Sequence, residues 1–231
     1  MSRAALWLFD IDGTLVDTGG AGLVALGDAA EEVFGDRGPA LDLRGATDSG
    51  LLRDYFVHFG REANDEDRER FYAFYLRRLE QHLQSGDFPS RVLPGVVELL
   101  ERVAEREEVA VGLLTGNIEE GAWLKVRHFG LERFFEFGAF GCEHADRNLL
   151  GPVALAKAAA HAGRSFGAEE IVVVGDTPKD IACAAAIGAR CLAVATGHVP
   201  AADLRGAWRV VEDLSDPKGW ADLLEGVVEG G

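Results

Sequence analysis

Two acidic side chains, one residue apart, follow an unbroken apolar run near the start of the chain. Asp10 and Asp12 come directly after apolar residues 4–9, and Gly13 with Thr14 then predicts a turn. A run without polar alternation is typical of a strand buried on both faces. We therefore expect both acids at the C-terminal end of a buried strand, where open α/β sheets bind ligands. Because such carboxylates point the same way, they repel each other unless a cation lies between them.

Two further apolar runs, 109–114 and 171–174, also predict buried strands that end in polar residues. The residues that follow them are Thr115, Gly116 and Asn117 after the first strand, and Asp176 and Asp180 after the second. Parallel strands end at one edge of a sheet, so these side chains should converge with Asp10 and Asp12. An all-oxygen set of ligands favours Mg²⁺. The hydroxyl of Thr115 suits a phosphate, as do the free N–H groups of the helix that Gly116 and Asn117 open. Helix capping is the more common role for a residue such as Asn117, so Thr115 is the better functional candidate.

These motifs resemble those of the haloacid dehalogenase superfamily of phosphohydrolases, in particular its phosphoglycolate-phosphatase-like members with a helical cap. The first motif is Asp10-Ile11-Asp12-Gly13-Thr14, the second is Leu113-Leu114-Thr115-Gly116-Asn117, and the fourth is Gly175-Asp176-Thr177-Pro178-Lys179-Asp180. The resemblance covers essentially the whole chain. It implies an enzyme, a phosphatase that acts on small phosphomonoesters.

The resemblance also implies a role for each acid. Asp10 would be the nucleophile that forms an aspartyl-phosphate, and Asp12 would protonate the leaving oxygen and later activate water. Asp10, Asp176 and the backbone carbonyl of Asp12 would bind Mg²⁺, and Asp180 would bind it directly or through a neighbouring ligand. An acid at Asp12 favours phosphoryl transfer over dehalogenation, because an alkoxide needs a proton and a halide does not.

The cation of the third motif is the point at which this sequence departs from the family. The usual Gly-Lys-Pro is absent, and either Arg147 or Lys157 is the replacement. We expect Arg147, because it lies in the loop that leaves the third strand and its guanidinium group can contact a carboxylate and a phosphate together. Lys125 and Lys179 are expected on helices, facing water.

The elements alternate between strand and helix after Pro94, which predicts a doubly wound parallel sheet of the Rossmann type. Residues 1–18 and 90–231 should form this core, with helices at 96–108, 118–130, 152–162 and 181–186 and further strands at 134–140, 191–195 and 208–211. Residues 19–89 show only helical periodicity, with Thr47 and Asn64 as helix caps, and should form a helical cap. We expect this cap to move on joints at 19–20 and 89–95 and to close over the substrate.

Substrate selection is expected to fall to the cap. Arg44 and Thr47 lie in a loop before its second helix and offer a cation and a hydroxyl, so they are candidates for binding the substrate. The alternative is an ordinary capped helix start with an exposed arginine. Caps of this kind serve phosphoglycolate, sugar phosphates and nucleotides, and the sequence does not choose among them.

The composition of the chain limits the kinds of ligand and partner that we expect it to bind. The chain has 231 residues with a net charge of −16, which argues against nucleic acid as a ligand. Three cysteines without a CxxC pair suit a reducing compartment. We see no signal peptide or membrane span and expect a cytoplasmic monomer or homodimer that binds a small phosphorylated metabolite. The alternatives are a phosphosugar mutase with the same site, a signalling module phosphorylated on Asp, and an inactive binding protein.

Overall fold

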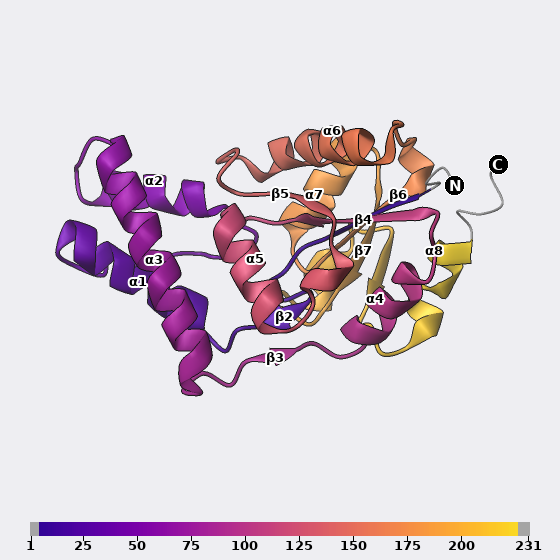
Figure 1. Ribbon diagram of the computed structural model, residues 1–231, viewed down its shortest axis with the longest axis horizontal. Coiled ribbons are helices and arrows are strands. Elements are labelled where there is room, and N and C mark those ends of the chain that lie inside the picture. Colours follow the sequence, from indigo (N-terminus) through magenta and orange to yellow (C-terminus); the bar gives the residue numbers. More distant parts are fainter. Residues whose placement is uncertain (1–4, 226–231) are drawn as a thin grey trace.

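A six-stranded parallel sheet forms the centre of the computed structural model, which describes residues 5–225 (Figure 1). Its strands, in spatial order, are β5 (Phe137–Ala139), β4 (Val109–Leu114), β1 (Ala5–Phe9), β6 (Ile171–Gly175), β7 (Arg190–Val194) and β8 (Arg209–Val211). Phe9 pairs with Leu113 on one side and with Val174 on the other, so these three strands end side by side. The predicted α/β core is therefore confirmed.

Helices cover both faces of the sheet, because β1 is apolar at every position. Trp7 and Phe9 pack on one face with residues of α4 (Val96–Ala104), α5 (Glu119–His128) and α8 (Ala221–Glu225). Leu6 and Leu8 pack on the other face with residues of α6 (Leu150–Ala162) and α7 (Pro178–Ala186). Burial on both faces explains the continuous apolar runs in the sequence.

Three helices between β1 and β4 pack on one another beside the sheet, at the left of Figure 1, and we call them the helical insert. They are α1 (Ala21–Phe34), α2 (Asp48–His58) and α3 (Asp65–Ser85). Phe71 and Leu79 of α3 are fully buried in their common core. Both predicted caps form: Thr47 Oγ1 accepts from Gly50 N at 3.1 Å, and Asn64 Oδ1 accepts from Asp67 N at 2.8 Å.

The two connections to the helical insert run side by side. β2 (Val16–Asp17) pairs antiparallel with β3 (Arg91–Val92), and a Cβ on Gly19 would lie 2.8 Å from Pro89. The two expected joints are thus in direct contact. Sequence periodicity missed this ribbon, because two residues are too few to show alternation.

Several element boundaries differ from those expected. α7 begins at Pro178 rather than at 181, because Thr177 caps it and proline is favoured in a first turn, so Asp180 is a helical residue. α6 begins at Leu150 rather than at 152 and follows a 3₁₀ turn at Arg147–Leu149. α4 ends at Ala104 rather than at 108, and β5 is only three residues long.

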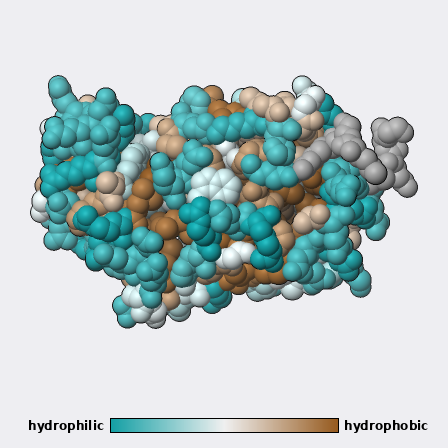
Figure 2. All heavy atoms as spheres, in the orientation of Figure 1, coloured by the Kyte–Doolittle hydropathy of each residue, from teal (hydrophilic) through white to brown (hydrophobic). Residues whose placement is uncertain are grey.

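Hydrophilic residues cover most of the helical insert on the face shown in Figure 2, and hydrophobic residues show between the insert and the sheet.

Within residues 5–225, no helix combines the length and the apolarity needed to cross a bilayer.

Gly95 precedes α4 and allows a close backbone approach. A Cβ there would lie 1.9 Å from the carbonyl carbon of Leu214, and φ is 76°. We expect Gly95→Ala to destabilise the fold by more than about 3 kcal/mol, as a severe steric clash does. Gly130→Ala is the matched control, because its φ is 71° and a Cβ there would meet nothing within 4 Å, so it should cost only about 1 kcal/mol. Equal losses for the two variants in denaturant unfolding would contradict the steric argument.

Candidate active site

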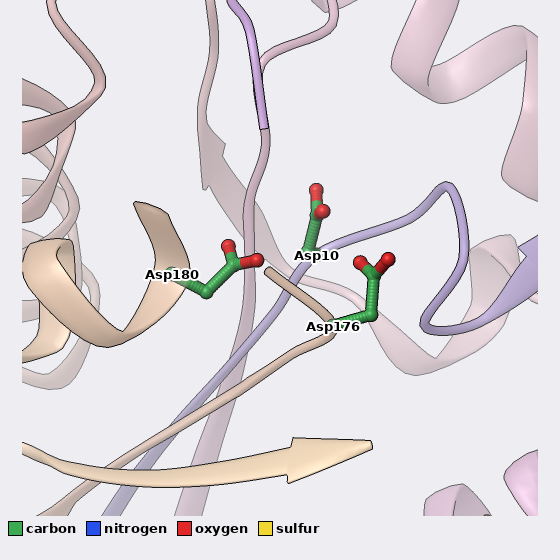
Figure 3. A group of neighbouring side chains, drawn as sticks. All are labelled: Asp10, Asp176 and Asp180. Carbon is green, nitrogen blue, oxygen red and sulfur yellow. The ribbon is translucent and has the colours of Figure 1, made fainter. Parts of the chain in front are cut away.

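Three buried carboxylates meet where β1 and β6 end. Asp10 follows β1, Asp176 follows β6 and Asp180 lies in the first turn of α7, and one oxygen from each lies within 4.8 Å of the others (Figure 3). The carboxylates of Asp10 and Asp176 point the same way from neighbouring strand ends, while Asp180 points toward Asp10. Carboxylate oxygens this close form a donor set suited to a hard divalent cation.

The surroundings of Asp176 keep its carboxylate in this position. Thr14 Oγ1 donates to its Oδ1 at 3.1 Å. A Cβ on Gly13 or Gly197 would lie 2.4 or 1.8 Å from its Oδ2, so only glycine leaves room for the carboxylate. The residues present therefore fit a divalent metal.

Arg147 supplies positive charge to this cluster from the turn before α6. Its Nη2 lies 3.1 Å from Asp10 Oδ1 and also donates to Asp180 Oδ1. The other oxygen of Asp180 accepts from Thr177 N at 3.0 Å and from Thr177 Oγ1 at 2.7 Å. Asp180 thus has a protein partner on each oxygen, which favours an indirect role at a metal. Lys157 lies elsewhere, with its Nζ 2.7 Å from Gly138 O and 3.0 Å from Glu143 Oε1.

Burial has the largest effect on the pKa values of these acids. It raises the pKa of Asp10 to about 6, although Arg147 opposes the shift, and neighbouring carboxylates add to it. Burial, together with the charges of Asp180 and Asp10, raises the pKa of Asp176 to about 8. The protein alone therefore leaves excess negative charge here, which a divalent cation would offset.

Asp12 has a different cationic partner from the acids of this cluster. Lys125 Nζ, on α5, lies 2.8 and 2.6 Å from the two carboxylate oxygens of Asp12 and 2.6 Å from Asn117 Oδ1. Asn117 Nδ2 donates to Asp12 Oδ2 and to Thr115 Oγ1, each at 2.8 Å. Two expectations are therefore wrong. Lys125 is buried at 3% exposure instead of facing water, and the Asn117 side chain does not cap the helix.

The helical insert contacts this same region through the start of α2. Asp48 N donates to Gly116 O at 2.7 Å, and Asp48 Oδ2 accepts from Ile118 N at 2.8 Å, next to the start of α5. Thr47 Oγ1 donates to Ala145 O at 2.8 Å. Burial raises the pKa of Asp48 to about 6, while Lys125 opposes the shift. A Cβ on Gly116 would lie 1.9 Å from Ala46 O, so glycine is needed for this approach.

A cavity of about 410 Å³ lies between the helical insert and the sheet. Its lining includes most of the residues singled out from the sequence: Asp10, Asp12, Arg44, Thr115, Gly116, Asn117, Arg147 and Asp176. Arg44 is exposed, and its guanidinium group is already paired with Asp42, with Nε–Oδ1 and Nη2–Oδ2 distances of 2.8 and 2.9 Å. Thr47 is not among the residues that line the cavity, because its hydroxyl is turned to Ala145.

Lys125 and Asp48 are the residues of this site to which sequence reasoning gave no role. A signal for Lys125 was present, because it lies three residues after Ala122 and one before Val126, on the buried stripe of α5. Nothing local distinguishes Asp48 from an ordinary acid in the first turn of a helix.

Comparisons with known proteins place the chain in a family. The family model described as haloacid dehalogenase-like hydrolase matches residues 7–194. The chain therefore belongs to the haloacid dehalogenase-like hydrolases, as its motifs predicted, and it is an enzyme of that class. No curated protein matches the chain.

Solved structures share the fold at low identity. A hydrolase from Pseudomonas syringae is 24% identical with a TM-score of 0.70, over 94% of this chain and 98% of that one. CbbY from Rhodobacter sphaeroides in complex with phosphate is 17% identical with a TM-score of 0.72, over 96% and 99%. A predicted phosphoglycolate phosphatase from Haemophilus somnus is 18% identical with a TM-score of 0.64, over 94% and 96%. At these identities the likeness shows the fold alone.

The position of Arg147 between two acids generates a kinetic prediction. Arg147→Ala should lower kcat/KM for hydrolysis at least about 10²-fold, the usual effect of removing a charge-stabilising donor. Arg147→Lys should recover part of the loss, because lysine keeps the positive charge but lacks the paired N–H donors of the guanidinium group. Lys157→Ala, which removes an ion pair away from the cavity, should change kcat/KM by less than about threefold. Circular dichroism would establish that each variant folds, and the reverse kinetic ranking would contradict the assignment.

The contact of Lys125 with Asp12 generates a second prediction. Lys125→Met keeps an unbranched side chain but removes the ammonium group that contacts both oxygens of Asp12, so kcat should fall about 10²-fold with little change in KM. Arg127→Met is the matched control, because Arg127 lies on the same helix in an exposed ion pair with Glu132. A rise in KM without a fall in kcat, or an equal fall in kcat in both variants, would show that Lys125 does not position Asp12.

Proposed function

We propose that this protein hydrolyses a small phosphomonoester in a Mg²⁺-dependent reaction, through a phosphorylated Asp10. The observation that carries the proposal is the arrangement of acids and cations that line one part of the cavity. There, Asp10 lies in contact with Arg147 and near Asp176, while Asp12 is held beside them by other partners.

In the first half of the reaction, a carboxylate oxygen of Asp10 attacks phosphorus and the bond from phosphorus to the alcohol oxygen breaks. Asp12 gives its proton to the departing alkoxide. Arg147 and the Thr115 hydroxyl bind the phosphoryl oxygens. Thr115 Oγ1 accepts from Asn117, which leaves its own proton free to donate.

In the second half, water attacks the phosphorus atom of the Asp10 acyl phosphate while Asp12 takes a proton from that water. Inorganic phosphate leaves and the Asp10 carboxylate is restored. The sum of the two halves is one phosphomonoester and one water converted to one alcohol and one phosphate. Acid–base help from a positioned carboxyl is typically worth about 10²–10⁴-fold.

Asp10, Asp176 and the backbone carbonyl of Asp12 would hold Mg²⁺. When bound, the ion supplies positive charge that lets a dianionic phosphate approach the acids. In this proposal Asp180 acts through Arg147 and Thr177, the partners it already has.

The proposal predicts that turnover requires both Asp10 and a divalent cation. Asp10→Asn should lower kcat below detection while the protein remains folded, because an amide is not a nucleophile toward phosphorus. Excess chelator should abolish phosphate release from a panel of phosphomonoesters, and added Mg²⁺ should restore it. Asp54→Asn, at an exposed acid of α2, is the control.

Robust turnover in chelator, or near-normal kcat for the Asp10 variant, would overturn the mechanism. The same assay separates the phosphosugar mutase alternative. A mutase would convert a hexose 1-phosphate to an isomeric phosphosugar, whereas the proposed enzyme releases free phosphate.

A further inference from the structure

Part of the cavity lining is apolar. Five leucines contribute to it: Leu23 and Leu26 of α1, Leu41 and Leu43 of the loop after α1, and Leu51 of α2. Leu26 and Leu51 also belong to the buried core of the helical insert. Leu23 is 50% exposed, although it lies in a helix whose other leucine is buried. An exposed leucine that borders a cavity is available for contact with a ligand.

Each arginine or lysine that lines the cavity already has a carboxylate partner within residues 5–225. Arg147 contacts Asp10 and Asp180, and Lys125 contacts Asp12. Arg44, the cation beside the leucines, is held by both oxygens of Asp42. Hydrogen bonds from Arg44 hold the pKa of Asp42 at about 2, so this partner stays charged at neutral pH.

Further negative charge lines the same space. Asp48 and Asp17 border the cavity, although Asp17 Oδ2 lies 3.1 Å from Arg91 Nη2. His198 is the only other basic side chain among the described lining residues. The lining aspartates outnumber the lining arginines and lysines, so a second anionic group on a ligand would meet net negative charge. An alkyl or similarly uncharged group could instead contact the leucines.

We propose that the substrate is a phosphomonoester whose alcohol part is uncharged and apolar, and that a carboxylated or second phosphorylated alcohol is discriminated against. This inference rests on the proposed function for its chemistry. It goes further by naming the group that the helical insert accepts. It also disfavours phosphoglycolate, whose alcohol part carries a carboxylate.

Binding tests this preference separately from turnover. Hexylphosphonate and 6-phosphonohexanoate have the same chain and differ only in a terminal methyl against a terminal carboxylate, and neither has a phosphorus–oxygen–carbon bond to break. In calorimetry with Mg²⁺ present, we expect the protein to bind hexylphosphonate at least tenfold more tightly. Equal affinity, or tighter binding of the carboxylated phosphonate, would overturn the inference.

A charge introduced into the wall should reverse the preference. Leu23→Lys places a cation beside the leucines without altering the carboxylates, and it should tighten 6-phosphonohexanoate and weaken hexylphosphonate. Val57→Lys adds the same charge at a 75% exposed position of α2 outside the cavity lining, and it should leave both affinities unchanged. The same shift in both variants would attribute the effect to net charge and contradict the placement of the substrate.

Turnover of pentyl phosphate and 5-phosphonooxypentanoate completes the comparison, since both release an unactivated primary alcohol. We expect kcat/KM to be at least tenfold higher for pentyl phosphate. If neither ester is hydrolysed but hexylphosphonate binds selectively, the proposed phosphatase function fails while the preference of the cavity stands. If both are hydrolysed with the carboxylated ester preferred, the function stands and this inference fails.

Discussion

The mutual repulsion of buried carboxylates is the constraint on which this site depends. Asp10, Asp176 and Asp180 are removed from water, and the cost of burying charge rises steeply unless an opposite charge is near. Arg147 meets part of this need by contacting two of the three acids. Arg147 does not offset the whole cost of burying these charges, and the pKa values of Asp10 and Asp176 are therefore raised. The remaining negative charge makes the cluster suited to a metal.

A second cation separates the roles of the two acids in the first motif. Asp12 is held by Lys125 and Asn117, while Asp10 contacts Arg147, so neighbouring carboxylates in the sequence have different partners. Such a division fits a pair in which one acid attacks phosphorus and the other moves a proton. Both acids follow β1, while their cationic partners come from α5 and from the turn before α6.

The helical insert takes part in the same network. Asp48 accepts from Ile118 at the start of α5, the helix that also carries Lys125, and its backbone contacts Gly116. The position of the insert and the surroundings of Asp12 are therefore physically linked. The two-stranded ribbon of β2 and β3 joins the insert to the sheet, so a movement of the insert would alter contacts close to the acids.

Local sequence determined the elements that carry the site. Continuous apolar runs marked the strands buried on both faces, the caps at Thr47 and Asn64 marked two helices, and the three motifs marked the strand ends. These features depend on residues close together in the chain, so periodicity and capping chemistry reveal them. The ribbon of β2 and β3 is too short for periodicity to reveal it. The first turn of α7 was missed although Thr177 and Pro178 are local signals for it.

Only the tertiary structure decided which charges meet. Arg147 and Lys157 were both open for the place beside Asp10, and the packing of α6 on the sheet brings Arg147 there and turns Lys157 to Glu143. The same holds for Lys125, whose long side chain reaches Asp12 because α5 packs its buried stripe against the sheet. The partners of a long charged side chain depend on how distant elements pack, and sequence spacing alone does not specify that packing.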